Sequence, residues 1–479
     1  MGVFDKYSTV VERTETIRHI GRVKRVQGLL LESDGPQAVV GEVCQIELAP
    51  GGPMVYGEVV GLRGQTVQLM PFTEIDGVQI GSRVIASGTR LNVPVSDALL
   101  GRVLGPLGRP VDGRGQPGSE TVYPVLTTPP DPLDRTTIRE QLVTGVRSID
   151  GLIAAGKGQR LGVFSGSGVG KSTLIGMIAR NTKADINVIA LIGERGREVR
   201  EFIENDLGPE GLKRSVVIVS TSNTPPLARL RGAFVATAIA EYFRDQGNDV
   251  MLLFDSVTRF ARAQREIGLA TGEAPATRGF PPSVFSLLPK LLERTGTSHA
   301  GSITGFYSIL VEGDDMDEPV SDTVRGILDG HIVLSRQLAQ RYHYPAIDVL
   351  NSVSRLATKV TPPDVQEAAG YVRRVMATYR EAEDLINVGA YAQGSNAEID
   401  EAIRKMPQIN AFLRQRVDEQ ALIEETQNAL LDIAEMENPR AGGQGGEASE
   451  GADEWAAVGN NEGALGYNPV SNLVGGDNA

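Results

Sequence analysis

The amino-acid sequence predicts an α/β protein with a mostly parallel sheet, a small β-barrel before it and a helical domain after it. Three observations predict this fold. Short β-rich runs separated by Gly, Pro and Asp fill residues 21–90, which is typical of a small closed barrel. Apolar strands alternate with helix-like stretches over residues 91–360, which indicates a sheet covered on both faces. Residues 361–438 contain helix-spaced apolar positions: Val375, Tyr379, Ala382, Ile386, Ile409, Leu413 and Val417.

The two ends of the chain differ from these regions. Within residues 1–20, Phe4, Tyr7 and Val11 are helix-spaced among charges, which predicts an amphipathic helix over 4–17 that either binds a partner or packs on its own domain. Residues 439–479 are rich in glycine and acidic side chains. From residue 441 onwards there are ten glycines, six acidic residues and no Lys or Arg. This composition predicts a disordered acidic tail.

Composition excludes several classes of protein. The 479 residues carry a formal net charge of -13, so we expect no nucleic-acid partner. No long apolar run and no signal-like start occur, so we expect a cytoplasmic location. The single cysteine, Cys44, excludes an intramolecular disulfide, and we expect it to be a half-buried core residue. The histidines are scattered singly and predict no metal site.

A glycine-rich segment, SGSGVGKST at residues 165–173, lies between the predicted strand QRLGVFS and the predicted helix KSTLIGMIARN. Glycines let the backbone curl around phosphates, and the helix N-terminus attracts anions. Lys171 can reach the β- and γ-phosphates, and the Ser172 hydroxyl can coordinate Mg²⁺. Ser165 stands where the usual motif begins with glycine, but no phosphate ligand is lost. We therefore predict a P-loop NTPase core whose nucleotide contacts are Gly166, Ser167, Gly168, Val169, Gly170, Lys171, Ser172 and Thr173.

Two carboxylates are expected at the same edge of the sheet. Asp255 ends the predicted strand DVMLLFD and is the expected second Mg²⁺ residue, although an aspartate after an apolar run is by itself more often a cap. Glu194 follows the strand INVIALIG and is the candidate for orienting the attacking water. Arg195 beside it is placed to touch the γ-phosphate. We interpret the next charged residues as a solvated helix face: Arg197, Glu198, Arg200 and Glu201.

With YPAIDVLNSVSR at residues 344–355, the chain resembles the ring-forming ATPases related to the catalytic subunits of rotary ATP synthases. SGSGVGKS, GERGREVREF and the long segment from SVTRFARAQREIG to LLERTG most resemble the flagellar protein-export ATPase and its virulence type III secretion relatives. The resemblance spans roughly residues 20–435.

The resemblance implies a mechanism and an assembly. Adenine would pack on Tyr344, and Arg355 would reach into the neighbouring protomer's site to assist water attack on the γ-phosphate. The family forms homohexamers whose barrels make ring contacts. Implied partners are a stator-like protein at the N-terminus, the export gate, a stalk and chaperone–substrate complexes, with the ring peripheral to the inner membrane through these partners.

Three alternatives remain open. The equivalent ATPase of an injection-type secretion system differs mainly in its docking partners. A non-catalytic ring subunit would usually lack the carboxylate at Glu194. An RNA translocase would need a basic or aromatic surface, whereas the barrel region offers only scattered cations: Arg22, Lys24, Arg25 and Arg63.

Overall fold

The structure is a computed structural model that describes residues 19–49, 51–119 and 121–436. The expected helix over residues 4–17 and the expected tail at 439–479 lie outside the described residues. The predicted fold class is confirmed, because a barrel, a mostly parallel sheet and a helical region follow one another along the described chain.

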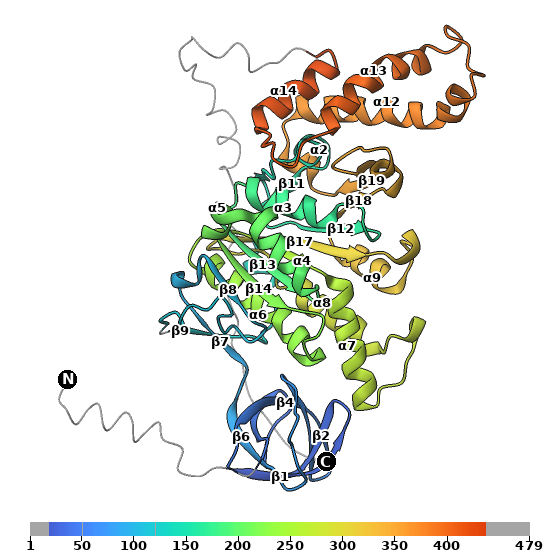
Figure 1. Ribbon diagram of the computed structural model, residues 1–479. Helices are drawn as coiled ribbons and strands as arrows, with labels where there is room; N and C mark the ends of the chain where they lie inside the picture. Colours follow the sequence, from blue (N-terminus) through green and yellow to red (C-terminus); the bar gives the residue numbers. More distant parts are fainter. Residues whose placement is uncertain (1–18, 50, 120, 437–479) are drawn as a thin grey trace, which may run out of the picture. The chain divides into compact units, whose positions relative to one another are not determined.

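The N-terminal barrel is closed and has the strand order β1-β2-β5-β4-β3-β6, in blue in Figure 1. Neighbouring strands are antiparallel, and β1 pairs with β6 to close the barrel. Cys44 is fully buried there beside Leu31 and Ile46, so the prediction of a half-buried residue is wrong. The reason is that closure leaves inward-facing side chains no route to solvent. The strands are β1(Ile20–Gln27), β2(Leu30–Asp34), β3(Glu42–Glu47), β4(Met54–Arg63), β5(Thr66–Pro71) and β6(Arg83–Arg90).

The central sheet has nine strands and the order β19-β18-β12-β17-β15-β13-β14-β8, with β16 paired to β17. Only the β18–β19 and β16–β17 pairs are antiparallel within it. Its strands are β8(Arg102–Leu104), β12(Arg160–Ser165), β13(Ile186–Ile192), β14(Ser215–Ser220), β15(Asp249–Asp255), β16(Gly296–Thr297), β17(Ser302–Leu310), β18(Gly330–Leu334) and β19(Ile347–Ser354). Two small sheets pair β7(Asn92–Val95) with β9(Thr121–Pro124) and β10(Gln141–Leu142) with β11(Ala155–Gly156).

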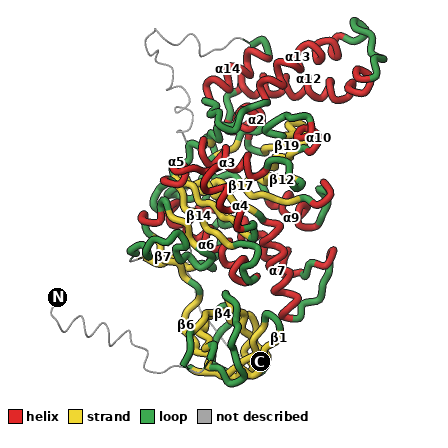
Figure 2. The backbone as a smooth tube through the Cα atoms, viewed as in Figure 1, coloured by secondary structure: helices red, strands yellow, loops and turns green. Residues whose placement is uncertain are grey.

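Alternate residues of the central strands enter two separate cores. On β15, Leu252 belongs to one cluster of buried side chains, and its neighbours Met251 and Leu253 belong to the other. Because successive side chains of a strand point to opposite faces, the continuous apolar runs in the sequence cover both faces. Figure 2 shows the helices around these strands.

The first core is lined by α6(Pro226–Asp245), α7(Val257–Thr271), α8(Pro282–Leu292) and α9(Pro319–Ile327). The second contains α3(Lys171–Asn181) and residues of the C-terminal helices α12(Pro363–Asn387), α13(Ala397–Leu413) and α14(Ile423–Ile433). Shorter helices are α2(Arg147–Leu152), α4(Gly196–Glu201), α5(Gly208–Lys213), α10(Arg336–Gln340) and α11(Ala357–Val360), with a π-helical turn at Phe202–Leu207. Across the described ranges, no helix is long and apolar enough to cross a bilayer.

One helical expectation is wrong. Val417 continues the apolar spacing of Ile409 and Leu413, but α13 ends at Leu413 and the next residue, Arg414, has an extended backbone. Val417 instead lines a pocket beside Tyr344. The four-residue interval was misleading because the chain leaves the helix at Arg414, so Val417 belongs to the loop that follows.

Candidate functional site

The glycine-rich loop connects β12 to α3. Gly168 and Gly170 have φ values of +77° and +95°, in the left-handed region that favours glycine. Gly170 immediately precedes α3, so the loop delivers Lys171 to the first position of that helix. Because β12, β13, β15 and β17 are parallel, their carboxyl ends meet at one edge of the sheet. A cavity of about 500 Å³ opens at this edge.

Lys171 and Asp255 meet in this cavity. The Lys171 Nζ donates to Asp255 Oδ1 at 2.5 Å, and the Ser308 hydroxyl donates to the same carboxylate oxygen at 2.6 Å. Asp255 is the last residue of β15 and is 5% exposed. The lysine that the sequence assigns to phosphate binding is therefore paired with a buried carboxylate.

Glu194 lies two residues beyond the end of β13 and is 8% exposed. Arg259 from α7 contacts both oxygens of the Glu194 carboxylate, with Nε 3.1 Å from Oε1 and Nη2 3.2 Å from Oε2. The same guanidinium donates to the Gly193 carbonyl at 2.6 Å. Burial raises the pKa of the Glu194 carboxyl to about 7, and the charge of Asp255 adds to this rise, while Lys171 and Arg259 oppose it. Glu194 is thus a buried carboxyl group whose pKa is raised toward neutrality by its surroundings.

A second pocket, of about 320 Å³, adjoins the phosphate loop and holds Tyr344. A carbon added at Gly170 would lie 3.5 Å from the Tyr344 ring, so the aromatic ring closely flanks the loop. The Gln415 backbone N–H donates to the Tyr344 carbonyl at 3.0 Å, and Gln415 and Val417 line the same pocket. This apolar slot with an aromatic wall suits a planar base.

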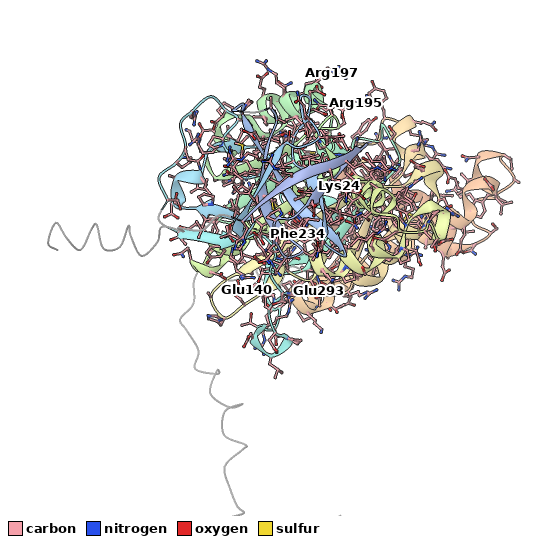
Figure 3. All side chains as sticks on the ribbon, turned by 90° about the horizontal axis from the view of Figure 1, so that it is seen from below. Lys24, Glu140, Arg195, Arg197, Phe234 and Glu293 are labelled. Atoms are coloured by element: carbon pink, nitrogen blue, oxygen red, sulfur yellow. The ribbon has the colours of Figure 1, made fainter. Side chains whose placement is uncertain are left out.

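The arginine beside Glu194 lies at the rim of the cavity. The Arg195 side chain is 74% exposed and pairs with Glu198 at 3.5 Å. Figure 3 shows Arg195 and Arg197 at the periphery of the ribbon. Arg195 still contributes to the lining of the cavity, so it is within the region that a nucleotide would enter.

The interpretation of the following charges as a solvated face is only partly right. It describes Arg197 and Arg200, whose side chains are exposed. It is wrong for Glu198, because a hydrogen bond with Glu194 lowers the Glu198 pKa and the residue lines the cavity. Glu201 also lines the cavity. The helix α4 runs along the mouth of the site, so one of its faces meets the ligand space rather than bulk solvent.

Arg355 does not join the other predicted residues. It follows the last residue of β19, is exposed, and its backbone N–H donates to the Asp329 carbonyl at 3.0 Å. It is absent from the lining of both the phosphate cavity and the base pocket. Val169 is also absent from both linings, because its side chain is buried in the hydrophobic core beneath the loop. Within one chain, the two pockets are therefore lined by every predicted residue except Arg355 and Val169.

Three residues of the site were missed from the sequence. Arg259 stands in the SVTRFAR segment one turn after Asp255, and Ser308 is a polar residue in the buried strand GSITGFYSIL. The signal for Ser308 was a hydroxyl in an otherwise apolar strand end. Gln415 gave no usable signal, because only folding brings it to the pocket beside the phosphate loop.

The fold and the two adjoining pockets define a nucleotide-binding protein of the P-loop class. Sequence comparison assigns three regions. The ATP synthase alpha/beta family nucleotide-binding domain matches residues 145–354, and the beta-barrel domain of that family matches residues 23–88. The T3SS EscN ATPase C-terminal domain matches residues 361–432.

Individual relatives show to which family of ATPases the chain belongs. The chain is 59% identical to a flagellum-specific ATP synthase of Treponema pallidum (89% of this chain, 95% of the relative). It is 51% identical to a type 3 secretion system ATPase of Xanthomonas euvesicatoria (87% and 95%). The assembled ATPase EscN of enteropathogenic E. coli, solved with its central stalk EscO, matches with a TM-score of 0.80 at 43% identity (86% and 99%). The chain belongs to the family of flagellum-specific ATP synthases and type 3 secretion system ATPases, and it is an ATPase.

Proposed function

We propose that this chain is the Mg-dependent ATP hydrolase of a homohexameric ring that energises protein export through the flagellar type III secretion apparatus. The observation that carries the proposal is the meeting of Lys171, Glu194 and Asp255 in one cavity beside the Tyr344 pocket. The similarity to a flagellum-specific relative at 59% identity supports the flagellar assignment over the injection-type one.

The phosphates would bind the backbone N–H groups of residues 166–173 and the side chain of Lys171. Lys171 would exchange Asp255 for the β- and γ-phosphates, since these carry more negative charge than one carboxylate. The adenine ring would pack on Tyr344 in the adjoining pocket. Glu194 would accept a hydrogen bond from the attacking water and hold it in line with the γ-phosphate.

The residues present fit magnesium. Ser172 is exposed in the cavity and Asp255 ends the neighbouring strand, so a hydroxyl and a carboxylate supply the oxygen ligands that Mg²⁺ prefers. In the part of the chain that the structure describes, no cluster of three or more His, Cys, Asp or Glu could hold a metal unaided. Magnesium would therefore share the nucleotide's phosphates as ligands, and when bound it would neutralise their charge.

The ring would complete the site. Arg355 is exposed and outside both pockets of its own chain, which supports a role in the site of a neighbouring protomer. Arriving there, its guanidinium would stabilise charge that develops on the γ-phosphate. Arg195 at the rim would contact the same phosphate from its own chain. The assembled EscN relative supports such a ring.

The remaining partners follow from the family. The stalk of the EscN complex supports a stalk partner for this chain. We further propose that residues 1–20 bind a stator-like protein and that the C-terminal helices face the export gate and chaperone–substrate complexes. The ring would be cytoplasmic and would reach the inner membrane only through these partners.

Two levels of experiment test the proposal. In the purified protein, Lys171→Ala should weaken nucleotide binding, whereas Glu194→Gln should bind nucleotide and lose turnover. Full turnover by Glu194→Gln would refute the water-orienting role. Arg355→Ala should bind nucleotide normally but lose the steep dependence of specific activity on protein concentration.

In the cell, a chromosomal Lys171→Ala strain should lose swimming motility and secretion of flagellar proteins. Lys183→Ala, a lysine two residues after the end of α3, is the matched control and should swim normally. Normal motility of the Lys171→Ala strain with loss of another secreted set would assign the chain to an injection-type system.

A further inference from the structure

Ser308 lies at the centre of the nucleotide edge of the sheet. Its strand, β17, stands between β12, which carries the phosphate loop, and β15, which ends in Asp255. In register, Ser308 is opposite Val163 on one side, and its predecessor Tyr307 is opposite Phe254 on the other. The side chain is fully buried. The Ser308 hydroxyl thus lies between the strand that leads into the phosphate loop and the strand that ends in Asp255.

Three polar groups converge at this point. Ser308 Oγ donates to Asp255 Oδ1 at 2.6 Å, and Lys171 Nζ donates to the same oxygen at 2.5 Å. Lys171 Nζ also approaches Ser308 Oγ at 3.4 Å, where the hydroxyl oxygen accepts. The hydroxyl therefore contacts both members of the Lys171–Asp255 pair while using its single proton for the carboxylate.

Nucleotide binding, as proposed above, would disturb this arrangement. If Lys171 turned to the phosphates, Asp255 Oδ1 would lose a charged donor, although the carboxylate is 5% exposed and poorly reached by water. A buried acceptor left without a donor is strongly destabilised. Ser308 cannot follow the lysine, because its strand is paired on both sides within the sheet, so its hydrogen bond to Asp255 can persist through the exchange.

We propose that Ser308 is a positioning residue that holds the Asp255 carboxylate in place while Lys171 transfers to the nucleotide. The proposal rests on the proposed function, since it assumes that Lys171 binds phosphate and Asp255 faces the metal. By keeping Oδ1 occupied, Ser308 orients the second oxygen of Asp255 toward the metal side of the cavity. Its contribution is to nucleotide and Mg²⁺ affinity rather than to the attack of water.

The same strands contain a natural control. Ser302 Oγ donates to Asp249 Oδ1 at 2.8 Å, and Lys157 Nζ lies 2.7 Å from Asp249 Oδ2. Ser302 and Asp249 are directly opposite in register at the other end of β17 and β15. That Ser–Asp–Lys set lies about 20 Å from the phosphate edge, given the usual rise along a strand. Removing the Ser302 hydroxyl therefore measures what a buried serine–aspartate hydrogen bond contributes to the stability of these two strands, away from the phosphate edge.

The experiment compares Ser308→Ala, Ser308→Thr and Ser302→Ala in the full chain. Affinity for a fluorescent ATP analogue is measured by titration in Mg²⁺ and in EDTA, with steady-state hydrolysis and thermal unfolding in parallel. For Ser308→Ala we expect about tenfold weaker binding in Mg²⁺, a smaller loss in EDTA and a matching rise in KM, with kcat changed about twofold or less. Ser308→Thr keeps the hydroxyl and should restore binding, and Ser302→Ala should bind as the unaltered chain does.

Several results would overturn the proposal. Unchanged binding by Ser308→Ala, or an equal loss in Ser302→Ala, would show that the hydroxyl has no special role at the phosphate edge. Binding by a folded Ser308→Thr as weak as that by Ser308→Ala would show that strand packing, not hydrogen bonding, matters. Failure of the proposed function looks different: the unaltered chain would not hydrolyse Mg-ATP, or Lys171→Ala would bind nucleotide normally.

Discussion

Glu194 should make turnover depend on pH near neutrality. Burial and the charge of Asp255 raise the pKa of its carboxyl to about 7 in the nucleotide-free protein, and orienting water requires the ionised form. Because kcat/KM reports on the free enzyme, it should rise with pH from about one-tenth of its plateau at pH 6 to about half at pH 7. A profile that is flat from pH 6 to pH 8 would refute this reasoning.

Arg259→Gln is the substitution that should shift the pH profile of kcat/KM most directly. The Arg259 Nε lies 3.1 Å from Glu194 Oε1, a separation at which two unit charges attract by about 5 kcal/mol at an effective dielectric constant of 20. Lys171 and water will compensate for part of this loss, so we expect the midpoint of the kcat/KM profile to move to higher pH by about one unit or more.

The matched control for Arg259→Gln is Arg262→Gln. Arg262 is one turn further along α7 and pairs with Glu312, outside the lining of the cavity. Its kcat/KM profile should overlay that of the unaltered chain. Overlapping profiles for Arg259→Gln and the unaltered chain would contradict the assigned role of the Arg259 charge.

The same pKa predicts a trend in stability. The native state holds the Glu194 proton more tightly than the unfolded chain, whose carboxyl has a pKa near 4.5. The stability that Glu194 contributes is therefore present at low pH and lost as pH rises through about 7. Glu194→Gln, which cannot ionise, should gain thermal stability relative to the unaltered chain between pH 5 and pH 8. An unchanging difference in unfolding temperature would count against the raised pKa.

Three further predictions concern a buried ion pair, a buried thiol and the ring of Tyr344. The fully buried Arg294 pairs with Glu241 through two hydrogen bonds. Arg294→Met should therefore lower the free energy of unfolding, measured with denaturant, by about 3–5 kcal/mol, because Glu241 is left buried without a partner. Adding Glu241→Leu should recover much of this loss. Cys44 is buried, and that burial raises the pKa of its thiol to about 12. A thiol reagent should therefore label Cys44 only after the barrel unfolds. Rapid labelling of the native chain would contradict this prediction. Tyr344→Ala should raise KM for ATP about ten- to hundredfold through lost stacking, whereas Tyr344→Phe should leave KM nearly unchanged.

Local chemistry made much of the fold and site predictable from the sequence. The phosphate loop is contiguous, so its glycines, Lys171 and Ser172 could be assigned without knowing the fold. Asp255 was found because it ends an apolar strand, and Glu194 because it closely follows one, since the ends of parallel strands share one edge. The helix KSTLIGMIARN coincides with α3, since the loop glycines mark its start.

Other features depended on side chains that are far apart in the sequence. Arg259, Ser308 and Gln415 reach the site through helix packing and strand register, which leave no contiguous motif. Burial was misjudged where closure of the barrel enclosed Cys44. The surroundings of Glu198 were misjudged as well, because this partly exposed side chain lines the cavity. Sequence by itself determined the chemical groups that meet a phosphate, because adjacent residues encode them. Only the tertiary structure decided which distant groups hold them in place, because hydrogen bonds and burial depend on distance in space.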